Sequence, residues 1–394
     1  MDTRQLRPID ADNHYYEALD AFTRYQTREF RRRGVQVLAG HRGPMMVIGD
    51  RVNHFIPNPS FDPVIVPGCL DLMFRGQVPE SVDPKTMRAI EPIHPEYRDR
   101  DARVAVMDSQ GLDAVMLFPT MGCGVEEALR LDIDATMATL SAFNRWLEDD
   151  WGFAYQGRIF AAPMLSLADP AVAEAEAVSL IERGARVVHM RPAPVPGANG
   201  TSRSLGDPLH DRVWAVLAEA SVPVAFHLGD SGYNRLLAAW GTPERFEPFF
   251  NNDLLGKVLV SDRAIHDTMA SLLVHGVFQR HPTLRVASIE NGSDWLHLLV
   301  KRLHKLANQN PASFIEDPAD TVRRHIWVTP YYEENLDALA ELIGVERILF
   351  GSDWPHGEGL AEPLAFVDGL AGFGEAAVAR IMRDNASELL GTRQ

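Results

Sequence analysis

Eight short apolar runs, rich in valine, isoleucine, leucine and phenylalanine, restrict the fold of this sequence more than any other feature. Each has the length of a β-strand, and segments with helical spacing lie between most of them. The runs are Pro8–Asp12, Asp113–Phe118, Ile159–Leu165, Ala185–Met190, Val222–His227, Leu284–Ile289, Ile326–Thr329 and Arg347–Gly351. Strands that alternate with helices in this way indicate a parallel sheet with crossover helices.

The number of runs favours a closed barrel over an open sheet. A doubly wound open sheet usually has fewer strands, and it carries a glycine-rich phosphate turn, which follows none of the runs here. We therefore predict an α/β fold of the (β/α)8 TIM barrel type. The expected helices include Ala171–Gly184, Asp211–Ala220, Asp294–Leu306, Glu334–Ile343 and Ala376–Leu389.

Three segments are longer than a minimal barrel requires. We treat residues 1–394 as one domain, because barrels of this size form single domains. Residues 30–100 are proline-rich, and we expect them to be an insertion after the first strand that serves as a lid or an interface, with a small hairpin around Met45–Phe55. Residues 192–209 and 228–282 also follow strands, which predicts that all three segments lie at the carboxyl face of the barrel.

Composition excludes several classes of function. The formal net charge of −16 disfavours nucleic-acid binding, since an acidic surface repels phosphate backbones. The N-terminus has no secretory apolar region, and no apolar run is long enough to span a membrane. Two cysteines imply no disulfide framework, so we expect a cytoplasmic protein that acts on a small molecule. The apolar segment Trp240–Phe250 suggests a homodimer.

Residues suited to metal chemistry follow four of the predicted strands. Asp12 and His14 end the first strand, and the alternation of a strand puts both on the same side. His227 ends the fifth strand, Glu290 follows the sixth and Asp353 follows the eighth. Taken singly, such an aspartate is more often a helix cap and such a histidine a structural residue. Together at one barrel mouth, they indicate a site for zinc, manganese or iron(II).

At these positions the sequence resembles the amidohydrolase superfamily, in its amidohydrolase-related branch. That branch includes aminocarboxymuconate semialdehyde decarboxylase, hydroxybenzoate-type decarboxylases and several hydrolases. The motifs that carry the resemblance are IDADNH (9–14), FHLG (226–229), HPTLRVASIENGSDWLHLLVKRL (281–303), ILFGSDWPH (348–356) and MRDNASELLG (382–391).

The resemblance implies one divalent metal ion held by Asp12, His14, His227 and Asp353. Zinc is the first expectation, and manganese or iron are alternatives that the carboxylate of Asp12 modestly favours. Asp353 would also handle a proton. Glu290 stands where the known decarboxylases of the branch have a histidine, and it could act as a ligand or as a base. The fourth strand ends in HMRP without a lysine, which argues against a second, bridged metal.

The resemblance leaves two kinds of chemistry open. The first is hydrolysis of an ester, lactone or amide by water activated at the metal, with Asp353, Glu290 and His227 as catalytic residues. The second is non-oxidative decarboxylation of an aromatic or enoic acid, against which Glu290 argues as a poor neighbour for a substrate carboxylate. A barrel that only binds a ligand is a third reading, weakened by the cost of burying so many ionisable groups without a metal.

Substrate-binding residues are harder to predict than the metal site. Arg191 and His356 are candidates for orienting a polar or anionic substrate group, although Arg191 is equally consistent with an ion pair. Phe55, Phe61, Met73 and Phe74 in the 30–100 segment would either line an apolar pocket or form a small core of their own.

Overall fold

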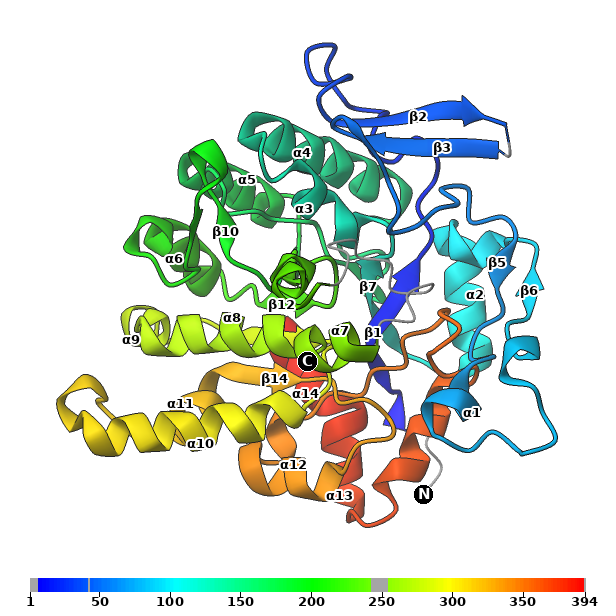
Figure 1. Ribbon diagram of the computed structural model, residues 1–394. Coiled ribbons are helices and arrows are strands. Elements are labelled where there is room, and N and C mark those ends of the chain that lie inside the picture. The colour runs from blue at the N-terminus through cyan, green and yellow to red at the C-terminus, as the bar shows by residue number, and fades with distance from the viewer. Residues whose placement is uncertain (1–5, 42, 242–253, 393–394) are drawn as a thin grey trace.

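The computed structural model of the chain describes residues 6–41, 43–241 and 254–392 (Figure 1). Parallel strands form the centre of the α/β fold. They are β1 (Ile9–Tyr15), β7 (Ala114–Pro119), β8 (Ile159–Ala161), β9 (Val188–Met190), β12 (Val224–His227), β13 (Val286–Ile289) and β14 (Ile326–Val328). β1, β7 and β8 pair as one sheet, and β9, β12, β13 and β14 pair as another.

Single bridges connect the two sheets at both ends. They pair Met164 with His189, Val328 with Ile348, and Asn13 with Trp354. The backbone N–H of Leu349 also donates to Val328 O, and that of Ala11 donates to Phe350 O, both at 2.8 Å. The order of pairing therefore runs from β1 through β14 to residues 348–354 and returns to β1.

Two of the predicted strands differ from their apolar runs more than the others do. β8 stops at Ala161, and Pro163, which has no N–H to donate, follows shortly after it. The run Arg347–Gly351 makes only isolated bonds to its neighbours on either side and is not a regular strand, so this element of the prediction is wrong in detail.

Alternate strand residues bury one apolar cluster between the strands and the last helix. The members from β7 are Ala114, Met116 and Phe118, and β12 and β13 contribute Ala225, Ala287 and Ile289. The intervening residues of the same strands, such as Val115 and Leu117, belong instead to the larger cluster that packs against the helices. Both faces of the strands are therefore buried, as in a parallel sheet covered by helices.

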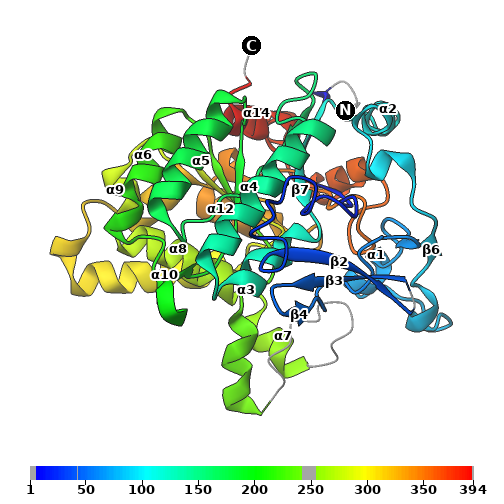
Figure 2. The same cartoon turned by 90° about the horizontal axis from the view of Figure 1, so that it is seen from above.

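Helices follow the strands along most of the chain and lie around them (Figures 1 and 2). They are α2 (Arg100–Gln110), α3 (Val125–Leu129), α4 (Ile133–Asp150), α5 (Pro170–Glu182), α6 (Asp211–Glu219), α7 (Leu254–Val260), α8 (Arg263–Val274), α9 (Val277–Arg280), α10 (Asp294–Gln309), α11 (Pro318–His325), α12 (Leu336–Ile343), α13 (Glu375–Ala379) and α14 (Asn385–Leu390). The helices predicted from periodicity are present within a few residues, except that a π-helical turn at Arg380–Asp384 joins α13 to α14.

The segment between β1 and α2 consists mainly of short hairpins. β2 (Val35–Gly40) and β3 (Gly43–Ile48) form an antiparallel pair that β4 (Arg51–Val52) extends, and β5 (Val64–Ile65) pairs with β6 (Ile90–Glu91). The short helix α1 (Asp71–Phe74) lies between β5 and β6 in the sequence. The β3–β4 pair lies where the sequence indicated a hairpin, around Met45–Phe55, and β2 adds a strand that begins about ten residues earlier.

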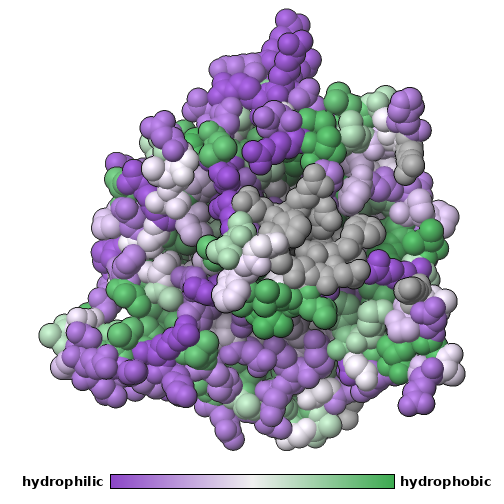
Figure 3. Space-filling model, in the orientation of Figure 1, coloured by the Kyte–Doolittle hydropathy of each residue, from purple (hydrophilic) through white to green (hydrophobic). Residues whose placement is uncertain are grey.

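An apolar area of the surface lies at α7, near the carboxyl ends of the strands. Figure 3 shows it in the position of α7, where Leu254, Leu255 and Val258 are exposed. Among the described residues, no helix has the length and apolar character needed to cross a membrane. Most of the segment predicted to form a dimer interface, Trp240–Phe250, lies outside the described residues.

Candidate functional site

Five ionisable side chains, from β1, β12, the residue after β13 and the segment after Phe350, meet at one place. Nε2 of His227 lies 3.1 Å from Nε2 of His14 and 3.1 Å from Oε2 of Glu290. Oδ1 of Asp12 is 3.5 Å from both imidazoles, and Oδ1 of Asp353 is 3.4 Å from Nε2 of His14. All five side chains are largely or fully buried, the most accessible being Glu290 with 14% of its side chain exposed.

These side chains form two overlapping groups of potential metal ligands. In the first, ligand atoms of Asp12, His14, His227 and Glu290 all lie within 4.8 Å of one another. In the second, His14 and Glu290 meet Asp353 and His356 within the same limit. The sequence-based set contained Asp353 where the first group contains Glu290, so the structure brings both carboxylates to the edge of one site.

The charges of the first group match a divalent cation. Burial lowers the pKa of His14, but the carboxylates of Asp12 and Glu290 outweigh it and the net pKa is raised. Burial likewise lowers the pKa of His227, and contacts with Cys123 and Asp12 raise it well above the ordinary value. The buried Oδ1 of Asp12 has no hydrogen-bond partner among the described residues. An acidic pocket that draws protons onto two imidazoles, with an unsatisfied carboxylate oxygen, fits a divalent metal.

Backbone strain accompanies two of the carboxylates. Glu290 and Asp353 have φ of 55° and 56°, in the left-handed region that non-glycine residues seldom adopt and that costs roughly 1–3 kcal/mol. Hydrogen bonds hold both: Glu290 N donates to Oγ1 of Thr329 at 3.0 Å, and Asp353 N donates to Asp12 O at 2.8 Å. This backbone conformation directs the side chains of Glu290 and Asp353 toward the carboxyl ends of the strands. Strain of this kind is typical of functional sites.

Asp10 anchors the strand end beneath the cluster. Its carboxyl group accepts hydrogen bonds from the backbone N–H of Asp12 and Ser352, from Nδ2 of Asn13 and from Oγ of Ser352. Burial raises the pKa of Asp10 to about 7. Gly351 permits the approach, since a Cβ there would lie 2.7 Å from Cβ of Asp12. The first and last strand positions are therefore fixed to one another just below Asp12 and Asp353.

A hydrogen-bonded chain of Asp353, His356 and Thr120 holds a proton at the site. Nδ1 of His356 is 2.6 Å from Oδ1 of Asp353, and its Nε2 is 3.1 Å from Oγ1 of Thr120. Thr120 donates its own proton to Tyr15 O, so its oxygen must accept from Nε2 of His356. Burial, and then the charges of His14 and His227, hold the pKa of His356 well below its usual range.

A neutral His356 that donates from Nε2 can only accept at Nδ1, which makes Asp353 the donor. The pKa of Asp353 points the same way, because burial and the neighbouring Glu290 raise it well above its ordinary value. Hydrogen-bond geometry and the directions of the two pKa shifts therefore agree in placing the shared proton on Asp353 rather than on His356.

Two adjoining cavities open from the cluster. One of about 250 Å³ is lined by His14, His227, His356 and the apolar side chains of Phe55, Met73 and Phe74, among others. The other, of about 220 Å³, is lined by Asp12, Asp353 and two tyrosines, Tyr331 and Tyr332. Phe74, Leu228, Glu290 and Glu358 line both. Phe61, by contrast, belongs to the buried core.

Glu358 is a site residue that the sequence did not single out. It lies two residues after His356 and faces both cavities. Burial, and then the charge of Glu290, raise its pKa to about 7. Only its position just after the GSDWPH motif could have drawn attention to it.

Arg191 lies away from these cavities. It is buried, with Nη1 2.5 Å from Oε2 of Glu127 and Nε 3.8 Å from Oε2 of Glu126. It is not among the residues that line either cavity. This geometry favours an ion pair over substrate binding as the role of Arg191.

The core beneath the cluster holds a second polar group. Sγ of Cys123 is 3.7 Å from Nδ1 of His227. His189 on β9 is buried beside them, and neither of its ring nitrogens has a hydrogen-bond partner among the described residues. Glu17 accepts hydrogen bonds from the N–H groups of Met121 and Gly122, which fixes the loop that carries Cys123.

Comparison with known proteins identifies the family. The family model described as amidohydrolase matches residues 9–392, nearly the whole chain. The chain belongs to the amidohydrolase family. Membership confirms the expectation, drawn from the strand-end motifs, of an enzyme that is a metal-dependent hydrolase or carboxy-lyase.

Two solved structures resemble this amidohydrolase over nearly its whole length. A solved amidohydrolase from Mycobacterium avium subsp. paratuberculosis K-10 is 58% identical, with a TM-score of 0.93 over 98% of this chain and 99% of that one. The 5-carboxyvanillate decarboxylase of Novosphingobium aromaticivorans, solved with bound manganese, is 15% identical with a TM-score of 0.60 over 98% of each chain, so it agrees in fold alone.

A curated relative is the 2-amino-3-carboxymuconate-6-semialdehyde decarboxylase of Dictyostelium discoideum. It is 27% identical over 128 residues, which make up 31% of this chain and 35% of that protein. The similarity therefore spans about a third of the curated relative.

Proposed function

We propose that this amidohydrolase is a metal-dependent decarboxylase of a small aromatic or enoic acid, built on a closed (β/α)8 barrel. The observation that carries the proposal is the hydrogen bond of 2.6 Å in which Oδ1 of Asp353 donates to Nδ1 of His356, beside a cluster suited to a cation. Decarboxylation needs such a proton donor for the carbon that loses its carboxylate. The decarboxylases among the relatives support this reading over hydrolysis.

One divalent ion would be held by Asp12, His14, His227 and Glu290, with Asp353 at its edge. When bound, such an ion supplies Lewis-acid charge that orients and polarises the oxygens of a substrate. Zinc suits the imidazoles, and the two carboxylates shift the preference toward manganese, which is present in the solved 5-carboxyvanillate decarboxylase.

The chain's own residues would bind the acid and deliver the proton. Phe55, Met73 and Phe74 give the cavity an apolar wall that excludes water from a ring or alkene. Asp353 would transfer its proton to the carbon that bears the carboxylate. The bond from that carbon to the carboxylate then breaks, its electron pair returns to the carbon framework, and carbon dioxide leaves. Asp353 remains as a carboxylate that recovers a proton from water, and His356 holds it in position.

Hydrolysis is the second candidate, and Glu290 favours it. Its carboxylate lies 3.1 Å from Nε2 of His227, where it would repel the carboxylate of an acid substrate and could instead accept a proton from water. An uncharged ester, lactone or amide would avoid that repulsion.

A substrate panel distinguishes the two reactions. The full chain, reconstituted with zinc or with manganese, would be given hydroxybenzoic and enoic acids in parallel with esters, lactones and amides, and carbon dioxide would be measured by mass spectrometry. The proposal predicts carbon dioxide release in D2O with one deuterium in the product at the former carboxylate position. Bond cleavage of the uncharged compounds without carbon dioxide would replace it with hydrolysis, and no turnover of either set by the metal-loaded chain would contradict both.

A further inference from the structure

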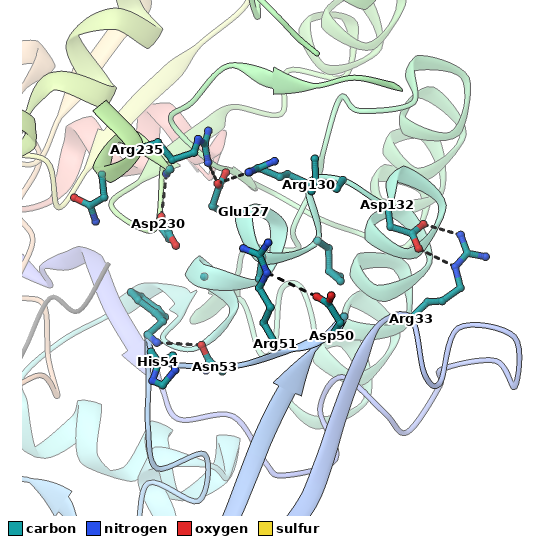
Figure 4. A pocket seen from close by; sticks show the side chains of 18 of the residues that line it. Arg33, Asp50, Arg51, Asn53, His54, Glu127, Arg130, Asp132, Asp230 and Arg235 are labelled. Atoms are coloured by element: carbon teal, nitrogen blue, oxygen red, sulfur yellow. Dashed lines mark hydrogen bonds and ion pairs between the residues drawn. The ribbon is translucent and has the colours of Figure 1, made fainter. Parts of the chain in front are cut away.

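A larger polar cavity lies on the other side of Phe55. Its volume is about 650 Å³, and it is formed by the loop after β3, by α3 with the residues that follow it, and by residues 230–235 (Figure 4). Five arginines and four acidic residues line it. An excess of cations in one cavity is unusual in a chain whose formal net charge is −16.

Three arginines beside this cavity share the carboxylate of Glu127. It contacts Nε of Arg130 at 2.9 Å, Nη1 of the buried Arg191 at 2.5 Å, and Arg235. Oε2 of Glu126 is 3.8 Å from Nε of Arg191, and the carboxyl group of Asp230 lies close enough for the charges of Arg191 and Arg130 to act on it. Within the described part of the chain, the terminal NH2 groups of Arg130 have no hydrogen-bond partner, so donors remain for another anion.

Arg51 adds a fourth guanidinium from the opposite wall. Figure 4 shows its side chain pointing from the loop into the cavity, toward the side where Glu127 and Arg130 lie. Its described ion pair is a long one, 3.7 Å to an Asp50 that is itself 95% exposed.

Phe55 separates this cavity from the one at the metal-ligand cluster. It lines both, and its ring packs on Gly124 so closely that a Cβ there would lie 2.7 Å from a ring carbon. The neighbouring positions Cys123 and Gly229 line the cluster's cavity, whereas Gly124 and Asp230 line the arginine cavity. A molecule bound at the cluster could therefore reach the arginines past one aromatic side chain.

We infer that the arginine cavity binds an anionic group, a carboxylate or a phosphate, between Arg51 and Arg130. The fork of N–H donors on a guanidinium matches both anions. The anion is either a free ion or the far end of a substrate whose reacting end lies at the cluster. The second source rests on the proposed function.

The first arm of the test uses inorganic phosphate at low ionic strength and the full chain. Phosphate binding would be measured by calorimetry for the wild type, Arg51→Gln and Arg130→Gln, with and without a metal chelator. Arg212→Gln is the matched control, because Arg212 is 81% exposed on α6 and lines no part of the cavity. We expect one equivalent to bind, each cavity variant to weaken binding about tenfold, and the control and the chelator to change nothing.

Three results would overturn the inference: no saturable binding, binding lost with the chelator, or binding unaffected by both cavity variants. Arg51 is 74% exposed on a loop, so Arg51→Gln carries the test even if Arg130→Gln fails to fold. None of these results depends on decarboxylation, so the proposed function can fail while this site stands.

The second arm identifies the source of the anion, using acids with and without a distal carboxylate or phosphate. A rise in KM caused by phosphate only for the acids with a distal anion assigns the cavity to the far end of the substrate. If phosphate raises KM equally for both kinds of acid, or for neither, the anion in the cavity is a free ion.

Discussion

The metal-ligand cluster and the arginine cavity lie on either side of Phe55 and differ in charge, burial and origin. In the cluster, carboxylates outnumber the two central imidazoles, and no side chain is more than 14% exposed. In the cavity, arginines exceed acids and the side chains of Arg51 and Arg235 are 74% and 45% exposed. Strand ends hold the first rigidly, while loops form much of the second. The difference suggests that one region performs chemistry on a fixed geometry and the other selects what enters.

Among the substitutions that compare the two regions, a change at Asp353 should have the largest effect on kcat. Asp353→Asn removes the transferable proton and should lower kcat about a thousandfold on any acid that the wild type decarboxylates. Steady-state kinetics measure it, and Asp368→Asn, at an exposed position, should leave kcat unchanged. A kcat within threefold of the wild type would remove Asp353 from the chemistry.

Substitution of Arg191 distinguishes a structural role of this side chain from a role in substrate binding. Arg191→Met leaves Glu126 and Glu127 with one cation fewer in a buried place, although Arg130 and Arg235 still contact Glu127. We expect the free energy of unfolding to fall by about 2 kcal/mol in urea, with KM unchanged. Arg24→Met, at a surface ion pair with Asp20, should cost less than about 1 kcal/mol. A raised KM with unchanged stability would return Arg191 to the substrate-binding residues.

The cluster should also make the metal-free protein sensitive to alkali, unlike the arginine cavity. The pKa of His14 and His227 is raised above 6.5 in the folded state, so the stability they contribute is present below that pH and is lost as the pH rises through the folded-state values. The raised pKa of Asp353 acts in the same direction.

From about pH 6 to about pH 9, the melting temperature of the chelated protein should therefore fall by at least about 3 °C. The metal-loaded protein should change less, because the metal replaces the protons. Scanning calorimetry of both forms measures this, and His227→Gln should flatten the metal-free profile. A metal-free profile that is flat or rises over this range would contradict the assigned charges.

Phe55 gives the smallest effect and the most direct comparison of the two regions. Phe55→Ala widens the passage between the cavities and should change KM about threefold for acids with a distal anion, leaving metal content intact. Phe74→Ala, which alters only the cavities at the cluster, should change KM for all acids alike. Identical responses of the two variants would mean that Phe55 does not separate two binding regions.

The strand-end residues could be predicted from sequence because their positions follow from strand periodicity. Asp12 and His14 lie two apart on one strand, and the carboxyl ends of parallel strands gather, so His227, Glu290 and Asp353 had to lie near them once the α/β order was right. The α/β fold is confirmed, and the closed barrel and the metal ligation stay proposals.

Other parts depend on contacts that no local pattern encodes. The anchoring role of Asp10 needs Ser352, more than three hundred positions away. The proton network needs Thr120 and His356 to meet, and the arginine cavity needs the loop after β3 to lie beside α3. Loops carry weaker periodicity than strands, so these features appear only when the chain is folded.

The most direct test of the central claim is the metal content of the purified full chain. Elemental analysis after reconstitution with zinc or manganese should find about one equivalent in the wild type and less than about a tenth in His227→Ala, while His304→Ala, at an exposed histidine, should match the wild type. A wild type that retains no metal, or a His227→Ala variant that retains a full equivalent, would contradict the assignment of the strand-end cluster as a metal site.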